Sequence, residues 1–462
     1  MLRIYQTTIL IIFTFLSAYA KQIQTDGLVT MYSVEELHQD LEYLHTSLIK
    51  YHPNLFTYQS KESFEKGFQT VREEINKPLT ENEFYRLVKP LVSAIKCGHT
   101  ELYFSDKYQS HHIPNSYPID VFVRENEIFV RQSNTAQLPV GSKIVSINQI
   151  AASDIINKLK VYISSDGTHQ NGREYWLSRN FFKLFEEILA ESPALQVVYE
   201  YNQTQKKVRL QPSTQQYDQH NLYEPLLSLQ YDPNSEVKTA TLDISSFDKR
   251  MLKQTGYNYN KFLKKVFEKI QEKDVDKLII DLRDNYGGND INAIELYSYI
   301  SDKPFKFYEK LSLKKGSKRF LKFPYKLFFP LKKDTETQMM VYNGHKGLKF
   351  LSPKKTAYTG ELEVLINGGT MSAATHFAAK CDNSGRAVLA GSTSGGAYTH
   401  SNSGFTIYRK TPNTGLQLFI PAIKYDLFLP NKIQEESGIQ PDIIIDEFIL
   451  GEKTAKLIKS GS

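Results

Sequence analysis

From about Val237 onward, short apolar runs alternate regularly with amphipathic stretches. The segments KTATLDISSF, VDKLIIDL, GELEVLIN and GRAVLAGS predict buried strands, whereas NYNKFLKKVFEKIQEK, DINAIELYSYI and SAATHFAAKC predict helices. This alternation is typical of β-α-β units, in which helices pack against a mostly parallel sheet. The sequence therefore predicts an α/β domain at residues 236–450.

Two glycine-containing turns follow strands of this predicted sheet. The turn LRDNYGG includes Gly287 and Gly288, and the segment INGGTMS leads to Ser372. Ligands of open α/β sheets bind beyond the carboxyl ends of the strands. Both turns are therefore candidates for one site.

Ser372 begins a predicted helix of small residues directly after this second turn. A helix N-terminus offers unpaired backbone N–H groups and the positive end of the helix dipole, and Ala373 and Ala374 would leave room for an acyl group. These features suit a serine nucleophile, but a serine in this place can equally cap the helix. The segment does not match the G-x-S-x-G pattern, so both interpretations stay open.

A serine nucleophile needs a base, and three histidines are candidates. His99 lies in IKCGHTEL, between a predicted helix end and a strand start, where functional side chains concentrate. His376 follows Ser372 by one helical turn, and its expected direction favours a buried or surface role. His400 lies in GGAYTHSNSG, which we expect to be a loop that could swing over the site. By local chemistry alone, each is more typical of a structural histidine.

The chain before this α/β domain begins with a helical region. Between Val34 and about Ile95, apolar residues recur at three- and four-residue spacing, which predicts amphipathic helices. Ser33 is the expected N-cap of the first helix. The sequence therefore predicts a helical N-terminal domain at residues 33–102.

The middle of the chain, residues 103–215, reads as a small mixed β domain. It begins with the alternating segment YPIDVFVRENEIFVRQ, in which Glu125 and Asn126 fit a hairpin turn. A glycine-led strand and a helix from about Ser153 follow. Trp176, the only tryptophan, is expected to pack in or beside this domain.

The N-terminus MLRIYQTTILIIFTFLSAYAKQ predicts a signal peptide over residues 1–20. It combines Arg3, an apolar run from Ile9 to Phe15 and the sequence AYA ending at Ala20. An uncleaved anchor is the alternative, but the run is shorter than the roughly 20 residues that a membrane span needs. We therefore expect an exported protein, periplasmic or extracellular, without stable membrane insertion after cleavage.

Charge is distributed unevenly along the chain. Between Lys303 and Lys355 there are 15 lysines and arginines but 3 acidic residues, a local charge of +12 in a chain whose total is +6. These basic residues alternate with aromatic ones, as in proteins that bind nucleic acid or anionic surfaces. Because an exported protein meets little nucleic acid, we interpret the segment as a β-ribbon with one solvated basic face and expect no nucleic-acid partner.

The chain has only two cysteines, Cys97 and Cys381. Their spacing fits no zinc or haem pattern, so neither a metal nor an organic cofactor is expected. They could form a disulfide in an oxidising compartment or remain buried free thiols.

Four motifs occur in a set order: CGHTEL, LIIDLRDNYGG, VLINGGTMSAATHFAAKCDNSGRAVLAGSTSGG and EESGIQPDIIID. Together they resemble the tail-specific, or C-terminal processing, serine peptidases and their tricorn-core relatives, over the span from Cys97 to Asp446. The resemblance implies a ClpP/crotonase-like β-α-β core and serine peptidase activity without a cofactor. The middle domain is similar to the PDZ-like domain of that family, although SINQ lacks the glycine usual in its turn.

By this resemblance, Ser372 matches the nucleophile, and the backbone N–H groups of Ala373 and of Gly287 or Gly288 match the oxyanion hole. Processing peptidases pair the serine with a lysine, but the matching segment STSGGAYTH holds Ala397 in that place and contains no lysine. The Ser-Lys dyad is absent. The resemblance is therefore to the tricorn-like branch.

That branch uses a histidine in the motif matched by GHT and an acidic residue in the motif matched by EESGIQPD. The resemblance assigns His99 as general base and Glu435 as the acid that orients it, with Glu436 as a close competitor. Gly98 stands where the pattern has a serine. Either Glu435 reaches the imidazole directly, Thr100 or a water substitutes for the serine, or another group orients His99.

The sequence thus predicts an exported serine endopeptidase that cleaves unfolded or C-terminally recognised proteins or peptides. The PDZ-like domain would hold a peptide by adding it as a strand to a sheet edge. One alternative is a peptide- or lipid-binding protein on the same fold with weak or no activity. Gly98 and the missing lysine favour that alternative, whereas Ser372, His99 and both glycine motifs favour an enzyme. A third interpretation is a binder of anionic polymers through the basic segment.

Overall fold

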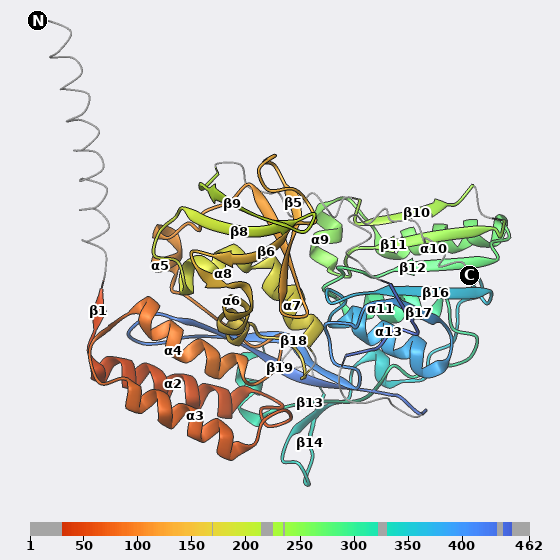
Figure 1. The fold of residues 1–462 in the computed structure, drawn as a ribbon. Helices are drawn as coiled ribbons and strands as arrows, with labels where there is room; N and C mark the ends of the chain where they lie inside the picture. The colour runs from red at the N-terminus through yellow and green to blue at the C-terminus, as the bar shows by residue number, and fades with distance from the viewer. Residues whose placement is uncertain are drawn as a thin grey trace, which may run out of the picture.

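The computed structural model describes residues 30–168, 170–213, 225–233, 236–321, 330–431 and 438–445. Within these ranges the strands form three six-stranded sheets and one two-stranded sheet, with helices packed around them (Figure 1). The predicted signal peptide lies outside the described residues. None of the helices in the described ranges has the length and apolar character that crossing a membrane requires.

The main sheet has the strand order β10-β11-β12-β16-β17-β20. All neighbours from β11 to β20 are parallel, and only the edge strand β10 is antiparallel. The predicted alternation of strands and helices is therefore confirmed, and the fold is α/β. The strands are β10 (Leu227–Tyr231), β11 (Thr239–Ile244), β12 (Lys277–Asp281), β16 (Glu361–Ile366), β17 (Val388–Gly391) and β20 (Ile443–Ile444), and the helices are α9 (Lys249–Gln254), α10 (Tyr259–Glu272), α11 (Asp290–Ser298) and α13 (Ala373–Ser384).

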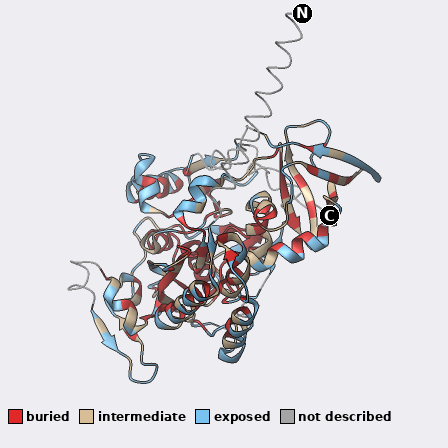
Figure 2. Ribbon diagram, turned by 90° about the vertical axis from the view of Figure 1, so that its left-hand side faces the viewer, coloured by how far each residue is buried: buried red, intermediate tan, exposed pale blue. Residues whose placement is uncertain are grey.

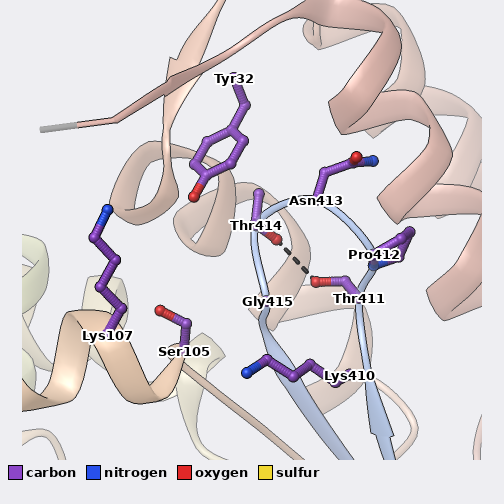
Figure 3. A pocket seen from close by; sticks show the side chains of 9 residues that line it. All are labelled: Tyr32, Ser105, Lys107, Lys410, Thr411, Pro412, Asn413, Thr414 and Gly415. Carbon is purple, nitrogen blue, oxygen red and sulfur yellow. Dashed lines mark hydrogen bonds between the residues drawn. The ribbon is translucent and has the colours of Figure 1, made fainter.

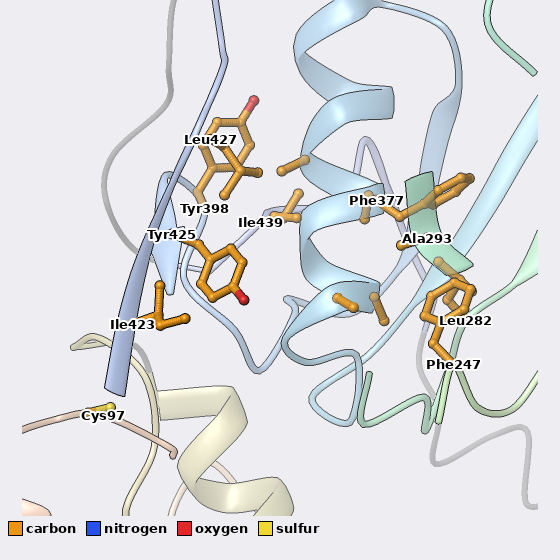
Figure 4. Close-up of a cluster of buried hydrophobic side chains, with 14 of the residues drawn as sticks. Cys97, Phe247, Leu282, Ala293, Phe377, Tyr398, Ile423, Tyr425, Leu427 and Ile439 are labelled. Carbon is orange, nitrogen blue, oxygen red and sulfur yellow. The ribbon is translucent and has the colours of Figure 1, made fainter. Parts of the chain in front are cut away.

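Helix α13 is buried on nearly all sides. Ten of its 12 residues are buried, which explains its small and apolar sequence AATHFAAKC. Figure 4 shows this helix between side chains of β19, such as Ile423 and Tyr425, and a cluster that includes Phe247, Leu282 and Ala293. The helix that begins at the candidate serine is thus fixed by the core of the protein.

A second sheet has the order β14-β15-β13-β19-β18, with β3 added along β19. Its strands are β3 (Glu101–Tyr103), β13 (Tyr308–Leu313), β14 (Leu331–Lys333), β15 (Met340–Tyr342), β18 (His400–Lys410) and β19 (Gln417–Leu427). The basic segment supplies β13, β14 and β15, and β14 and β15 form an antiparallel ribbon. Lys332 and Lys333 are exposed there, whereas Tyr308 and Leu311 of β13 are buried; residues 322–329 lie outside the described ranges.

The N-terminal helices α2 (Val34–Tyr51), α3 (Lys61–Glu74) and α4 (Glu81–Ser93) follow the predicted spacing. Ser33 caps α2, and Glu36 completes the capping box, so this prediction is confirmed. Strands β1 (Met31–Tyr32) and β2 (Leu79–Thr80) pair beside them. The buried side chains of these helices belong to the same hydrophobic core as those of the main sheet. Figure 2 marks the buried residues along the ribbon in red.

The middle region has a separate core. Its sheet has the order β4-β5-β6-β8-β9, with β7 beside β6, and its buried residues run from Tyr117 to Leu210. Glu125 and Asn126 both have positive φ between the paired residues Arg124 and Glu127, so the predicted hairpin turn is confirmed. The strands are β4 (Ile119–Arg124), β5 (Glu127–Ser133), β6 (Lys143–Ile147), β7 (Ile150–Ala151), β8 (Leu195–Tyr201) and β9 (Thr204–Leu210), and the helices of this part are α5 (Asp106–His111), α6 (Ala152–Leu159), α7 (Gln170–Arg179) and α8 (Phe181–Ile188).

Cys97 and Cys381 are both buried free thiols. Burial raises the pKa of Cys97 to about 12, and it also raises the pKa of Cys381. Of the two states that the sequence left open, the structure contains the unpaired one.

Candidate active site

The two glycine-containing turns lie side by side. Strands β12 and β16 are parallel neighbours whose residues pair up to Asp281 and Leu365. Their carboxyl ends therefore open onto the same edge of the main sheet. The N–H of Met371 donates to the carbonyl oxygen of Asn285 at 3.0 Å, which joins the two turns directly.

Two asparagine side chains fix the shape of these turns. Asn285 is fully buried; its Nδ2 donates at 2.7 Å to the last carbonyl of β11, and its Oδ1 accepts from the N–H of Gly287 at 2.8 Å. The Oδ1 atom of Asn367 accepts from the N–H groups of Asp284 and Gly369, each at 2.9 Å. Buried amides that are bonded in this way hold the backbone in one arrangement.

Ser372 occupies the N-cap position of α13 but does not cap the helix. Its φ of 53° and ψ of −123° are rarely adopted by residues with a Cβ, and its side chain accepts no hydrogen bond from the first helical turn. Such a conformation costs about 1–3 kcal/mol and is concentrated at functional sites. Its hydroxyl has no hydrogen-bond partner among the described residues. The helix-cap interpretation is therefore wrong.

Gly287 lies directly against this serine. A Cβ added at Gly287 would lie 2.7 Å from the Cβ of Ser372 and 2.9 Å from the backbone nitrogen of Ala373, closer than real atoms approach. The φ of Gly287, +89°, also favours glycine. Only glycine lets the turn after β12 approach the start of α13 so closely.

The backbone N–H groups around this contact differ in what they bond. The N–H of Gly287 is taken by Asn285. The N–H groups of Gly288 and Ala373 make no hydrogen bond with the described residues, and Gly288 is exposed. Two unpaired donors beside a serine at a helix N-terminus are the arrangement that stabilises an oxyanion.

His99 lies between α4 and β3, as its place in the sequence predicted. The neighbouring Gly98 packs against the serine turn, because a Cβ added there would lie 2.9 Å from Cε of Met371. The pKa of His376 in α13 is lowered to about 3, mainly by burial, with smaller lowering contributions from the nearby His99 and His400. The structure thus brings the His99 loop to the first turns of α13.

No hydrogen bond joins the His99 imidazole to the Ser372 hydroxyl in this structure. The Nδ1 atom of His99 is buried and has no partner among the described residues. Beside it, Asp166 accepts from the N–H of Gly98 through Oδ1 at 2.7 Å, while its Oδ2 is buried without a partner in the described ranges. One imidazole nitrogen of His99 and one carboxylate oxygen of Asp166 are thus both buried and without a partner in the described ranges.

The acidic residues assigned to that role by the resemblance, Glu435 and Glu436, lie outside the described residues. The described chain resumes at Gly438, which forms a β-bridge with Ala397. The two glycine N–H groups just before Ala397 donate to the carbonyl oxygen of Thr370 at 3.1 and 3.3 Å. The chain is therefore fixed beside the serine turn three residues after Glu435.

A hydrogen-bond network from α2 supports the His99 loop. His52 accepts from the N–H of Asn54 through Nδ1 at 3.2 Å, so its Nε2 carries the proton and donates to the Thr100 hydroxyl at 3.0 Å. Burial lowers the pKa of His52 to about 3, and Lys314 adds to the shift. This imidazole is therefore neutral at physiological pH and holds the residue next to His99.

His376 is a structural residue, as expected. It is 1% exposed, and its Nδ1 and Nε2 atoms form hydrogen bonds with the hydroxyl groups of Tyr308 at 2.9 Å and Ser401 at 2.8 Å. Both ring nitrogens are therefore occupied.

The expectation that His400 lies on a loop is wrong. It begins the strand β18, pairs with Asp426 of β19 and stacks on Tyr58, with ring centroids 5.9 Å apart. The glycine-, serine- and asparagine-rich sequence around it is typical of a loop. Pairing with β19 overrides that local preference.

A cavity of about 460 Å³ lies elsewhere, at the turn between β18 and β19 (Figure 3). Lys107 and Lys410 line it, and Lys410 pairs with Asp106 at 3.3 Å. None of the predicted site residues lines this cavity. Within the described ranges, no group of three or more His, Cys, Asp or Glu side chains could hold a metal ion.

Several residues near the site were not singled out from the sequence, among them Asp166, Tyr175 and Tyr286. Tyr286 lies inside the LRDNYGG motif, so an aromatic residue directly before the glycines was an available signal. Asp166 and Tyr175 come from the middle region, and no local pattern links them to residues of the main sheet.

Comparison with known proteins gives a family match and similar solved structures. Residues 238–445 match the family model of peptidase family S41. The crystal structure of mature CPAF is similar over 89% of this chain and 92% of its own, with a TM-score of 0.65 and 14% identity. Mature CPAF complexed with lactacystin is similar over 89% and 94%, with a TM-score of 0.64 and 15% identity. No curated protein matches the chain.

We expect Gly287→Ala to lower peptidase activity by at least about 100-fold, because the new methyl group would displace the serine from the oxyanion donors. Gly256→Ala is the matched control: its φ of +82° is similar, but nothing lies within 4 Å of the added Cβ. Gly256→Ala should lower the free energy of unfolding by about 1 kcal/mol and leave activity unchanged. Equal activity of both variants would contradict the described contact.

The two buried histidines predict that stability falls as pH decreases below 6.5. The pKa values of His52 and His376 are about 3 in the folded protein, so between pH 6.5 and 3 only the unfolded chain takes up these protons. Each group should contribute a slope approaching about 1.4 kcal/mol per pH unit. Urea unfolding at pH 7 and 5.5 gives the free energy of unfolding at each pH. Its pH dependence should be smaller in His376→Gln than in the unsubstituted protein, and unchanged in the exposed control His111→Gln.

Proposed function

We propose, from the premise that the chain belongs to peptidase family S41 and has the fold of serine-type peptidases, that it is an exported endopeptidase. Ser372 acts as nucleophile, His99 as general base and Glu435 as the acid that orients His99. The observation that carries this proposal is the conformation of Ser372: strained, uncapped, and in contact with Gly287 at the N-terminus of α13.

The oxyanion hole is assigned to the N–H groups of Gly288 and Ala373. Gly287 contributes close approach, because its own N–H is already bonded to Asn285. Donors that are unpaired before substrate binds require no rearrangement when the negative charge develops on the carbonyl oxygen. The asparagine contacts that fix both turns thus also fix the donors.

The reaction proceeds by acyl transfer. The Oγ of Ser372 attacks the peptide carbonyl carbon while His99 accepts its proton, and the oxyanion receives the two backbone hydrogen bonds. His99 then donates the proton to the amine nitrogen, the C–N bond breaks and an acyl-serine forms. A water molecule, deprotonated by His99, attacks this ester and releases the carboxylic acid, and the proton returns to Ser372.

Two acids compete to orient His99. Glu435 lies three residues before the fixed Gly438. Three residues of extended chain span up to about 10 Å, which limits how far Glu435 can lie from Gly438. Asp166 is already beside the His99 loop, and its buried Oδ2 has no partner in the described ranges. We assign the role to Glu435 because the resemblance places it there.

Export and the substrate class follow from the leader and the family. The predicted signal peptide, residues 1–20, would leave a mature chain that begins at Lys21, in the periplasm or outside the cell. Unfolded or C-terminally recognised proteins are the proposed substrates, and neither nucleic acid nor a cofactor is needed. An inactive binding protein on the same fold is not favoured by the family match.

Casein hydrolysis by the mature chain tests this proposal. The chain is purified from the exported fraction, and its N-terminus is checked by mass spectrometry. Ser372→Ala and His99→Ala should each lower the rate by at least about 1,000-fold, because neither attack nor proton transfer can then occur. Ser110→Ala and His111→Ala, in the surface helix α5, are matched controls and should retain full activity.

Amide substitutions of the three acids, measured in the same assay, identify which of them orients His99. Glu435→Gln should reduce activity strongly, and Glu436→Gln and Asp166→Asn should have smaller effects. A larger loss in Asp166→Asn would transfer the role to Asp166. Hydrolysis that survives Ser372→Ala would overturn the proposed function.

A further inference from the structure

Helix α7 of the middle region packs directly on the turn that carries the nucleophile. A Cβ added at Gly368 would lie 2.7 Å from Cβ of Tyr175, and one added at Gly369 would lie 2.7 Å from Cζ of the same ring. In Figure 1, α7 lies on the side of the middle region that faces the main sheet. Side chains of α7 therefore form part of the surroundings of Ser372.

Trp176 of α7 contacts both turns of the site. Its indole N–H donates to Sδ of Met371 at 2.9 Å, and its ring centroid lies 4.9 Å from that of Tyr286, with planes tilted by 40°. Met371 directly precedes Ser372, and Tyr286 directly precedes Gly287. These three side chains, Trp176, Tyr286 and Met371, are called here the aromatic wall.

Tyr286 is the exposed member of the aromatic wall. It is 41% exposed, whereas Met371 is 5% exposed. Its ring is nevertheless fixed, because Tyr175 donates its proton to Asp284 at 2.7 Å, and Tyr286 must therefore donate in the 2.9 Å contact between the two hydroxyl groups. A rigid, solvent-facing aromatic ring next to the oxyanion donors is available to a bound substrate.

A carboxylate lies near the wall. The carboxylate of Asp284 accepts from Tyr175 and from Nδ2 of Asn367, and it lies 3.5 Å from the guanidinium of Arg179. Arg179 also lies over the Tyr175 ring, 5.2 Å from its centroid. An acidic substrate side chain would therefore lose hydration here and approach the like charge of Asp284.

We propose that the aromatic wall is a subsite for a large apolar side chain of the substrate next to the scissile bond. The inference rests on the proposed function, since the wall adjoins the proposed nucleophile and oxyanion donors. Aromatic rings gain from burial against apolar and aromatic side chains, and one well-matched pocket commonly discriminates by about 10- to 200-fold. Phenylalanine and leucine should be preferred over alanine, and aspartate should be the least favoured.

A purely structural role for these residues makes a different prediction. If the wall only joined α7 to the main sheet, removal of the Tyr286 ring would weaken the fold and affect all substrates equally. A subsite instead predicts a loss that depends on the substrate side chain. The test must therefore compare matched peptides.

Trp176 provides a binding test that does not require activity. Because it is the only tryptophan, the emission of the Ser372→Ala protein reports on the wall alone. Capped alanine pentapeptides with phenylalanine, leucine, alanine or aspartate at the central position are titrated. We expect a saturable change in emission, with the phenylalanine peptide binding at least about tenfold more tightly than the aspartate peptide. Tyr286→Ala should abolish this difference, and equal affinities for all peptides would overturn the inference.

Hydrolysis of the same peptides, carrying a quenched fluorophore pair, gives the second test. Tyr286→Ala should lower kcat/KM about 10- to 100-fold for the phenylalanine peptide and at most about threefold for the alanine peptide. Tyr408→Ala, which removes a tyrosine that is 44% exposed on β18, is the matched control and should change neither.

The two tests separate the subsite from the proposed function. Selective binding without any cleavage by the unsubstituted protein would support the subsite and contradict the function. Cleavage that depends on Ser372 without preference for apolar side chains would support the function and contradict the subsite. An equal loss for all peptides in Tyr286→Ala would show a structural role only.

Discussion

The hydrogen bonds of Asn285 and Asn367 are the interactions on which the rest of the site depends. Parallel pairing of β12 with β16 brings two turns to one edge of the sheet, but pairing alone does not set the shape of either turn. The two buried amides do so, because they bind backbone N–H groups of both turns. The strained backbone of Ser372 persists because the surrounding structure leaves it no other arrangement.

The proposed base reaches this edge from a distant part of the chain. Strand β3 joins the second sheet beside β19, and the loop before β3 carries His99 to the start of α13. Asp166 from the middle region and His52 from α2 hold the two ends of that loop. The N-terminal helices and the middle region thus contribute to the site by fixing one short loop, so their removal should affect chemistry as well as stability.

Much of this arrangement could be predicted from the sequence, because apolar periodicity determined the strands and helices and parallel strands must end at one edge. The position of Ser372 beside Gly287 followed from that rule. His400 was misplaced because its loop-like sequence forms a strand only through pairing with β19. The contacts of Gly98 with Asp166 and of Met371 with Trp176 could not be predicted, since they join segments far apart in the chain and depend on tertiary packing.

We propose that Ser372 is an activated nucleophile held beside unpaired N–H donors. The most direct measurement is reaction of the mature protein with a fluorophosphonate, followed by peptide mass spectrometry to locate the modified residue. We expect one phosphonate per chain, attached to Ser372, and a much slower reaction in His99→Ala. Absence of labelling, or a label on another residue, would contradict it.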